Sequence, residues 1–398
     1  MPSSSSSSVP RLALGLACAA AAAAAAAPVV PTIALGNAAA PTAPVVPTIA
    51  LGNAAAPGMT MPYIGLGTGG YGATHNAYGQ YPECWMEIAN CGNYTVAAVK
   101  QWLALGGRRL DAADSYDTQY SVGVAMAESG VARSDIFLLS KTGNWNPMGY
   151  NDTLSQFDFL LEQMNTTYTD LLLNHWPTSP ASPTVDPLCD PKKPATYDAK
   201  ACRLSTWRAY VEIWTSGKSR AIGVANYGIS DLQEIIDAGM PLPAVNQVPY
   251  HLYNAGHQQP LKAFCAAHGI VLLSYSPLGI PDWHAFPTPA LPANSTLADP
   301  VVLAAAAAHA PATPAQVLLA WLFQQQMPSN PRSMSAAHMA ENLAVFSMGL
   351  ELSAAEMAAL SSRPLDLCSA DNSFYECVPS AGFAPAPHPW ARARAARE

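Results

Sequence analysis

The sequence predicts an α/β protein built as a (β/α)8 TIM barrel, with long loops on the face formed by the carboxyl ends of its strands. Short apolar runs of strand character alternate with helical patterns along most of the chain, which is typical of a parallel sheet with crossover helices. Three successive runs lead into a polar residue, namely Asp111, Lys141 and His175. Because active sites of such barrels lie at the carboxyl ends of the strands, the pattern also predicts where the chemistry takes place.

Residues 108–116 are the stretch around which this prediction is built. They follow a pair of glycines, end a strand-like run on Asp111 and add Tyr116 five positions later. Together with Lys141 and His175 from the next two strands, they supply an acid, a phenol, an amine and an imidazole. We expect these four groups to form one proton-transfer site.

The barrel elements follow one another within residues 59–363. The expected strands are residues 61–68, 108–111, 135–141, 170–176, 219–226, 244–250, 270–276 and 327–333. The expected helices are residues 96–105, 120–130, 153–164, 206–215, 230–238, 260–268, 300–308, 313–326, 336–346 and 353–360. Asn151 or Asp152 would cap the helix that begins at residue 153. The eighth strand is the poorest, because three of its seven residues are proline or asparagine.

Composition divides the chain into four segments. These are a leader at 1–27, a duplicated low-complexity linker at 28–58, the barrel at 59–363 and a tail at 364–398. Residues 28–41 and 44–57 are identical, and the second copy could supply a strand at 48–51. Three loops are unusually long, at residues 73–95, 177–202 and 278–297.

Charge and hydropathy exclude two classes of partner. A net charge of −8 and a pI near 5.5 argue against nucleic acid, whose binding surfaces are basic. Beyond the N-terminus no apolar run is long enough to cross a bilayer, so no stable membrane insertion is expected after removal of the leader.

The N-terminus predicts a targeted protein. Residues 12–27 form an uninterrupted small and apolar run after Arg11, which favours a secretory signal peptide. A Ser-rich, acid-free start also fits an organelle transit peptide, which stays the alternative. Four N-x-S/T sequons are present, at Asn93, Asn151, Asn165 and Asn294. They favour a glycoprotein of the secretory lumen or the extracellular space.

Cysteine spacing points to the same oxidising compartment. Six cysteines form short-range pairs: Cys84 with Cys91, Cys189 with Cys202, and Cys368 with Cys377. Each pair brackets a loop-like segment, as local disulfides do. Cys265 lies in an apolar helix and is expected to be a buried free thiol. The spacing lacks the paired C-x-x-C of a zinc site, and no metal is expected.

The ordered motifs resemble those of the aldo-keto reductases from about Thr48 to Ser362. The matching segments are Met61–Thr68, Leu110–Tyr116, Ser140-Lys141, Asn174–Pro177, Ile222–Asn226, Val245–Gln247, Ser274–Gly279, Asn330–Ser333 and Ala340–Asn342. So many motifs in order make the resemblance specific. It implies a TIM-barrel oxidoreductase that reduces a small-molecule aldehyde or ketone with NADPH.

The resemblance implies a catalytic tetrad of Asp111, Tyr116, Lys141 and His175. Hydride delivery to a carbonyl carbon builds charge on its oxygen and calls for a proton donor, for which Tyr116 is the expected general acid. A free tyrosine has a pKa of about 10, and a nearby Lys141 cation is expected to depress it. Asp111 would anchor Lys141, and His175 would orient the carbonyl.

The resemblance also implies a set of cofactor-binding positions. They are Asn226, Gln247, Tyr275, Ser276, Leu278, Arg332, Ser333, His338 and Asn342. The first two would bind the carboxamide, and Tyr275 would stack on the nicotinamide. Ser276 and Leu278 match the pyrophosphate segment. The remaining four match the segment that holds the 2′-phosphate and the adenine.

Four positions depart from the family pattern. Ala225 stands where a serine is usual, and His338 replaces an arginine that clamps the 2′-phosphate. Arg332 replaces the usual lysine but keeps a phosphate-binding cation, so NADPH stays the favoured cofactor, with NADH possible. Gly69 replaces a tryptophan and should open one wall of the substrate pocket.

Alternatives exist for single residues and for the whole protein. Taken alone, Asp111 could be a cap, Lys141 a solvated strand end and His175 a buried core imidazole. A rival hypothesis for the protein is a non-catalytic nicotinamide-binding barrel that acts as a sensor or scaffold. The ordered tetrad favours an enzyme, whereas Ala225 and His338 favour the rival. The sequence predicts neither the particular carbonyl substrate nor the oligomeric state.

Overall fold

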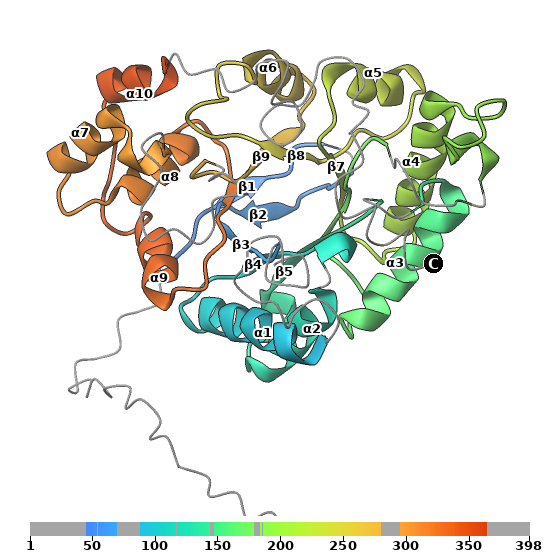
Figure 1. The fold of residues 1–398 in the computed structure, drawn as a ribbon, viewed down its shortest axis with the longest axis horizontal. Helices are drawn as coiled ribbons and strands as arrows, with labels where there is room; N and C mark the ends of the chain where they lie inside the picture. The colour runs from blue at the N-terminus through green and yellow to red at the C-terminus, as the bar shows by residue number, and fades with distance from the viewer. Residues whose placement is uncertain are drawn as a thin grey trace, which may run out of the picture. The chain divides into compact units, whose positions relative to one another are not determined.

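The structure, a computed structural model, is an eight-stranded parallel barrel wrapped by helices (Figure 1). It describes residues 45–53, 55–69, 88–116, 118–143, 147–178, 184, 186–279 and 295–363. The barrel strands are β3 (Gly65–Gly67), β4 (Arg109–Asp111), β5 (Phe137–Thr142), β6 (Leu171–Asn174), β7 (Ile222–Ala225), β8 (Val245–Pro249), β9 (Val271–Tyr275) and β10 (Ser329–Asn330). Each is parallel to the next in chain order, so the expected barrel class is confirmed.

The barrel closes between its first and last strands. A parallel bridge joins Ile64 to Ser329, and the amide of Gly67 donates to the carbonyl of Pro331 at 3.1 Å. The eighth strand, expected over residues 327–333, is only two residues long. Flanking prolines explain its shortness, because proline has no amide hydrogen for a sheet ladder.

Helices surround the strands, as Figure 1 shows. They are α1 (Ile88–Ala104), α2 (Gln119–Glu128), α3 (Tyr150–Gln163), α4 (Ala199–Thr215), α5 (Ile229–Asp237), α6 (Gln259–Ala267), α7 (Pro300–Ala308), α8 (Pro314–Gln324), α9 (Ala336–Ala344) and α10 (Ala354–Ser361). Their outer faces are exposed, while the strands are buried on both sides. All six residues of β5, for example, are buried.

The strand expected over residues 61–68 is two strands. Residues 60–62 form β2 (Thr60–Pro62), which pairs antiparallel with β1 (Thr48–Ala50), and only residues 65–67 join the barrel. The second copy of the duplicated segment therefore supplies a strand, as expected. Its Asn53 donates to the carbonyl of Pro243 at 2.6 Å, just before β8, which places this segment at the amino-terminal end of the barrel strands.

Three helices, α1, α3 and α4, begin at least three residues earlier than expected. α1 starts at Ile88 and α4 at Ala199, so the loops before them are shorter than the sequence predicted. The Asp198 carboxylate accepts from the amide of Ala201 at 2.9 Å and caps α4. The cap expected at Asn151 or Asp152 is wrong, because α3 begins at Tyr150 with Gly149 before it.

Cys189 and Cys202 form a disulfide that ties a short helical turn to α4, as expected from their spacing. Cys265 is a buried free thiol, also as expected. Of the other two expected pairs, Cys84, Cys368 and Cys377 lie outside the described residues, as do the leader, the first copy of the duplication and the tail. Within the described ranges, no helix is both long and apolar enough to span a bilayer.

Candidate active site

The four groups expected to form a proton-transfer site lie together at the carboxyl ends of β4 to β6. Asp111 ends β4, Tyr116 ends the short 3-10 turn that follows, Lys141 lies in β5, and His175 directly follows β6. The Lys141 ammonium donates to Asp111 Oδ1 at 2.5 Å and to Tyr116 Oη at 3.3 Å. Sequence-distant residues thus meet at one point, because adjacent parallel strands end on the same face of the barrel.

Lys141 is the centre of this cluster. Its side chain is fully buried, and its third contact is the carbonyl of Ala112 at 3.1 Å. An ammonium has three hydrogens, so the three acceptors hold its Nζ atom in one place. Burial lowers the pKa of Lys141, and the Asp111 carboxylate opposes that shift.

The pKa of the Tyr116 phenol shifts in the opposite direction from the one expected. Burial, and then the negative charge of Asp111, raise the pKa of the Tyr116 phenol well above 10. The expected depression by Lys141 is therefore wrong for this structure, because desolvation of the phenolate outweighs one cation at 3.3 Å. The phenol is protonated at neutral pH, which is the form that a proton donor requires.

His175 is 7% exposed, and its ring packs edge-on against Tyr116 with centroids 5.5 Å apart. The Ser115 hydroxyl lies 3.4 Å from its Nδ1 atom. Burial, and then the charge of Lys141, lower the pKa of His175 well below 6.5. The imidazole is therefore neutral at neutral pH and can offer one ring N–H to a substrate oxygen.

The second oxygen of Asp111 accepts hydrogen bonds from side chains of two other barrel strands. Gln247 Nε2 in β8 donates to Oδ2 at 2.5 Å, and Asn330 Nδ2 in β10 donates to the same oxygen at 2.7 Å. Because donors from β5, β8 and β10 all reach Asp111, its side chain lies in the barrel interior. From the sequence, Asn330 had no expected role, and Gln247 was expected to bind the cofactor alone.

The expected cofactor residues lie on the other half of the same face, after β7 to β10. The Tyr275 hydroxyl donates to Asn226 Oδ1 at 3.0 Å, and Asn226 Nδ2 donates to the carbonyl of His175 at 2.9 Å. Asn226 has a φ of 62°, which asparagine tolerates better than most residues. These bonds join the half that carries the cofactor residues to the half that carries the tetrad.

The remaining expected cofactor residues follow β9 and β10. Ser276 and Leu278 begin the loop after β9, and the Leu278 carbonyl accepts a hydrogen bond from Thr296. Arg332 and His338 are exposed, Ser333 is partly exposed and Asn342 is buried, all between β10 and the middle of α9. A cation and a hydroxyl beside a helix N-terminus are a donor set suited to phosphate.

The open pocket wall expected from Gly69 stays a prediction, and the structure shows a close contact between this residue and Tyr116. A Cβ atom built on Gly69 would lie 3.0 to 3.3 Å from carbon atoms of the Tyr116 ring. The backbone of residue 69 therefore packs directly on the phenol. A side chain at this position would require the ring or the loop to shift by a few tenths of an ångström.

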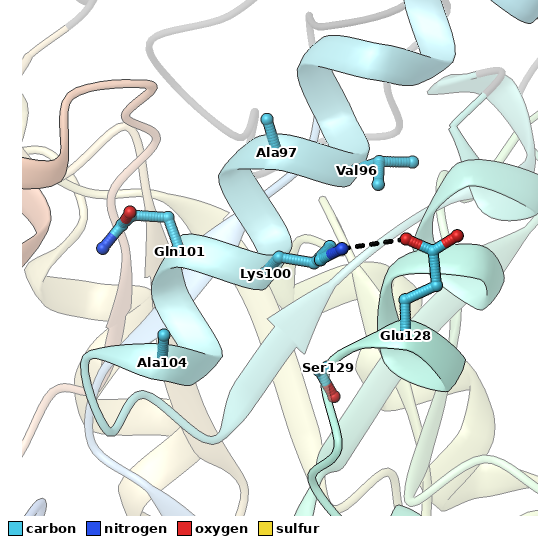
Figure 2. A pocket seen from close by; sticks show the side chains of 7 residues that line it. All are labelled: Val96, Ala97, Lys100, Gln101, Ala104, Glu128 and Ser129. Atoms are coloured by element: carbon cyan, nitrogen blue, oxygen red, sulfur yellow. Dashed lines mark hydrogen bonds and ion pairs between the residues drawn. The ribbon is translucent and has the colours of Figure 1, made fainter. Parts of the chain in front are cut away.

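In the part of the chain that the structure describes, features away from these strand ends give no competing site. Figure 2 shows a hollow between α1 and α2, where Lys100 and Glu128 form an ion pair at 2.9 Å. Both side chains are largely exposed, and none of the expected site residues lines the hollow. Among the described residues, no group of three or more His, Cys, Asp or Glu side chains could hold a metal ion.

A (β/α)8 barrel that gathers a tyrosine, a lysine, an aspartate and a histidine at its strand ends defines a barrel oxidoreductase. Residues 64–363, more than half of the chain, match the sequence profile of the aldo/keto reductase family. The chain therefore belongs to the aldo/keto reductase family.

Individual relatives agree with this assignment. The chain is 33% identical over 309 residues to morphine 6-dehydrogenase of Pseudomonas putida, covering 76% of this chain and 88% of that protein. It is 31% identical over 294 residues to glyoxal reductase of Bacillus subtilis, covering 74% and 86%. An aldo-keto reductase solved in complex with NADPH has a TM-score of 0.65 at 25% identity, covering 87% of this chain and 96% of that one.

Proposed function

We propose that this protein reduces an aldehyde or ketone to the alcohol with NADPH, and that Tyr116 donates the proton. The observation that carries the proposal is the buried Lys141 ammonium, which contacts both Asp111 and Tyr116. The family relationship supports the reaction class. The solved NADPH complex of a relative supports the cofactor.

In the proposed mechanism the protein stabilises and then protonates the negative charge that develops on the carbonyl oxygen. Bound NADPH supplies the hydride. The protonated phenol of Tyr116 donates its proton to the developing alkoxide, and Lys141 stabilises the phenolate that is left. Asp111 holds Lys141 in place, and the neutral His175 imidazole orients the carbonyl through an N–H group.

The residues present fit the proposed cofactor. Gln247 uses its Nε2 atom on Asp111, which leaves its carbonyl oxygen to accept from a carboxamide beside Asn226. The ring of Tyr275 would stack on the nicotinamide. Ser276 and Leu278 would lie along the pyrophosphate.

The 2′-phosphate end is the part that selects NADPH over NADH. Arg332 and Ser333 would bind this phosphate, with His338 on the first turn of α9 and Asn342 near the adenine. Arginine binds phosphate well, so the exposed Arg332 supports NADPH as the preferred cofactor.

An absorbance assay at neutral pH tests the proposal directly. Purified protein is expected to oxidise NADPH in the presence of at least one of a panel of sugars, short aldehydes and aromatic aldehydes, and to use NADH less well. NADPH binding without turnover on any of them would contradict the enzyme and support the rival role as a sensor or scaffold.

For its compartment, we propose the secretory lumen or the extracellular space, with an organelle as the alternative. The Cys189–Cys202 disulfide supports an oxidising compartment, and the Asn165 sequon lies on an exposed turn after α3. Thiol counting on denatured protein is expected to find one free thiol, that of Cys265. Seven thiols in the processed chain would instead indicate a reducing compartment.

A further inference from the structure

The shortest barrel strand holds a side chain that reaches the proposed catalytic group. Asn330 is one of two residues in β10 and is 5% exposed. Its Nδ2 atom donates to Asp111 Oδ2 at 2.7 Å, although the two residues are 219 positions apart. This contact crosses β3, which lies between β4 and β10 in the closed barrel. Asn330 belongs to neither the proposed tetrad nor the cofactor residues.

A buried arginine holds the backbone from which Asn330 projects. Arg109 lies two residues before Asp111 on the same face of β4 and is completely buried. Its Nη2 atom donates to the carbonyl of Ser329 at 2.6 Å and to that of Tyr63 at 3.3 Å. The seam of the barrel is therefore joined by a side chain from β4 as well as by main-chain bonds. The Arg109 hydrogen bonds add to the few main-chain hydrogen bonds that β10 can make, because that strand is only two residues long.

Gly65 in β3 makes room for both side chains. A Cβ atom on Gly65 would lie 2.5 Å from Arg109 Nε and 2.7 Å from Asn330 Oδ1. Neither distance is compatible with a real side chain at that position. The glycine thus allows an arginine from one neighbouring strand and an asparagine from the other to meet above it.

The two carboxylate oxygens of Asp111 accept hydrogen bonds from different partners. Oδ2 accepts from Asn330 and Gln247, whereas Oδ1 accepts from Lys141. Two donors on one oxygen prevent the carboxylate from rotating, so the other oxygen stays directed at the ammonium. Such supporting bonds hold a reactive group in its working geometry.

We propose that Asn330 is a positioning residue for the reductase reaction: it fixes the Asp111 carboxylate so that Lys141 stays against the Tyr116 hydroxyl. The inference rests on the proposed function. Loss of the amide frees Oδ2 on one side and lets the carboxylate turn. Lys141 follows its partner away from Tyr116, and a displacement of about 1 Å at a reacting group can cost about 100-fold in rate. We expect nicotinamide binding to be unaffected, since the Asn330 side chain donates to Asp111 and only the backbone of Asn330 pairs with Tyr275 in β9.

Asn330→Leu tests this, because leucine has the same branched shape and number of side-chain heavy atoms but no hydrogen-bonding group. We expect its kcat to fall roughly 10- to 100-fold while the Kd for NADPH stays within about twofold of the wild type. Asn330→Ala, which adds no volume, is the second variant and is expected to change in the same direction. Ser329→Ala is the matched control, since its buried hydroxyl has no partner among the described residues. It is expected to match the wild type in both measurements.

The outcomes separate this inference from the function on which it rests. An active wild type with unchanged kcat in both Asn330 variants overturns the positioning role alone. Loss of NADPH affinity in parallel with kcat also overturns it, because that result describes general damage to the fold. A wild type that binds NADPH but reduces no carbonyl overturns the proposed function, and the inference with it.

Discussion

Tyr116→Phe is expected to lower kcat by about 1,000-fold or more while leaving the affinity for NADPH within about twofold. A positioned proton donor contributes about 100- to 10,000-fold to such a reaction, and this substitution removes only the donor atom. Phenylalanine keeps the ring that packs edge-on against His175 and beneath Gly69. Stopped-flow hydride transfer together with an NADPH titration by fluorescence would separate chemistry from binding.

The pH dependence distinguishes Tyr116 from the other candidate donor, His175. The pKa of Tyr116 is raised well above 10, so its phenol is protonated throughout neutral pH and the rate is expected to be level from about pH 6 to 8. The pKa of His175 is lowered well below 6.5, so a proton from this imidazole would be available only in acid. Near-normal turnover in Tyr116→Phe, or a residual rate that rises steeply on acidification, would assign the proton to His175.

The sequence predicted the barrel and the tetrad because both depend on local patterns. A strand-like run that leads to Asp111, Lys141 or His175 is visible from the sequence alone, and parallel strands bring their ends together. The first strand was expected to be continuous because the apolar run passes through Pro62 without a break. Only pairing with β1, a tertiary contact, reveals that the run serves two sheets.

The role of Asn330 and the protonation state of Tyr116 could not be predicted from the sequence, because both depend on tertiary contacts. Asn330 lies between a serine and a proline in the poorest of the expected strands, and its partner is 219 positions away. The raised pKa of Tyr116 comes first from burial, which depends on how the loops after the strands pack. Gln247 was expected to face the cofactor, and the contact with Asp111 emerges only when β4 and β8 face each other across the barrel.

Lys141→Met is expected to destabilise the protein by about 3 kcal/mol and to lower turnover at least 100-fold. Removing one partner of a buried ion pair typically costs about 3–5 kcal/mol, because the other charge is left buried and unpaired. We expect the lower end of that range, since Gln247 and Asn330 continue to donate to Asp111. Urea unfolding gives the stability change, and NADPH oxidation gives the turnover.

The matched control is the double variant Asp111→Asn with Lys141→Met, which removes both charges. Replacing a buried ion pair as a unit is often close to neutral, so its unfolding free energy is expected to lie within about 1 kcal/mol of the wild type. A double variant as unstable as the sum of the single changes would contradict a coupled pair. A double variant that is stable, binds NADPH and remains inactive would mean that the Lys141–Asp111 pair serves proton transfer. The barrel would then owe little of its stability to these two charges.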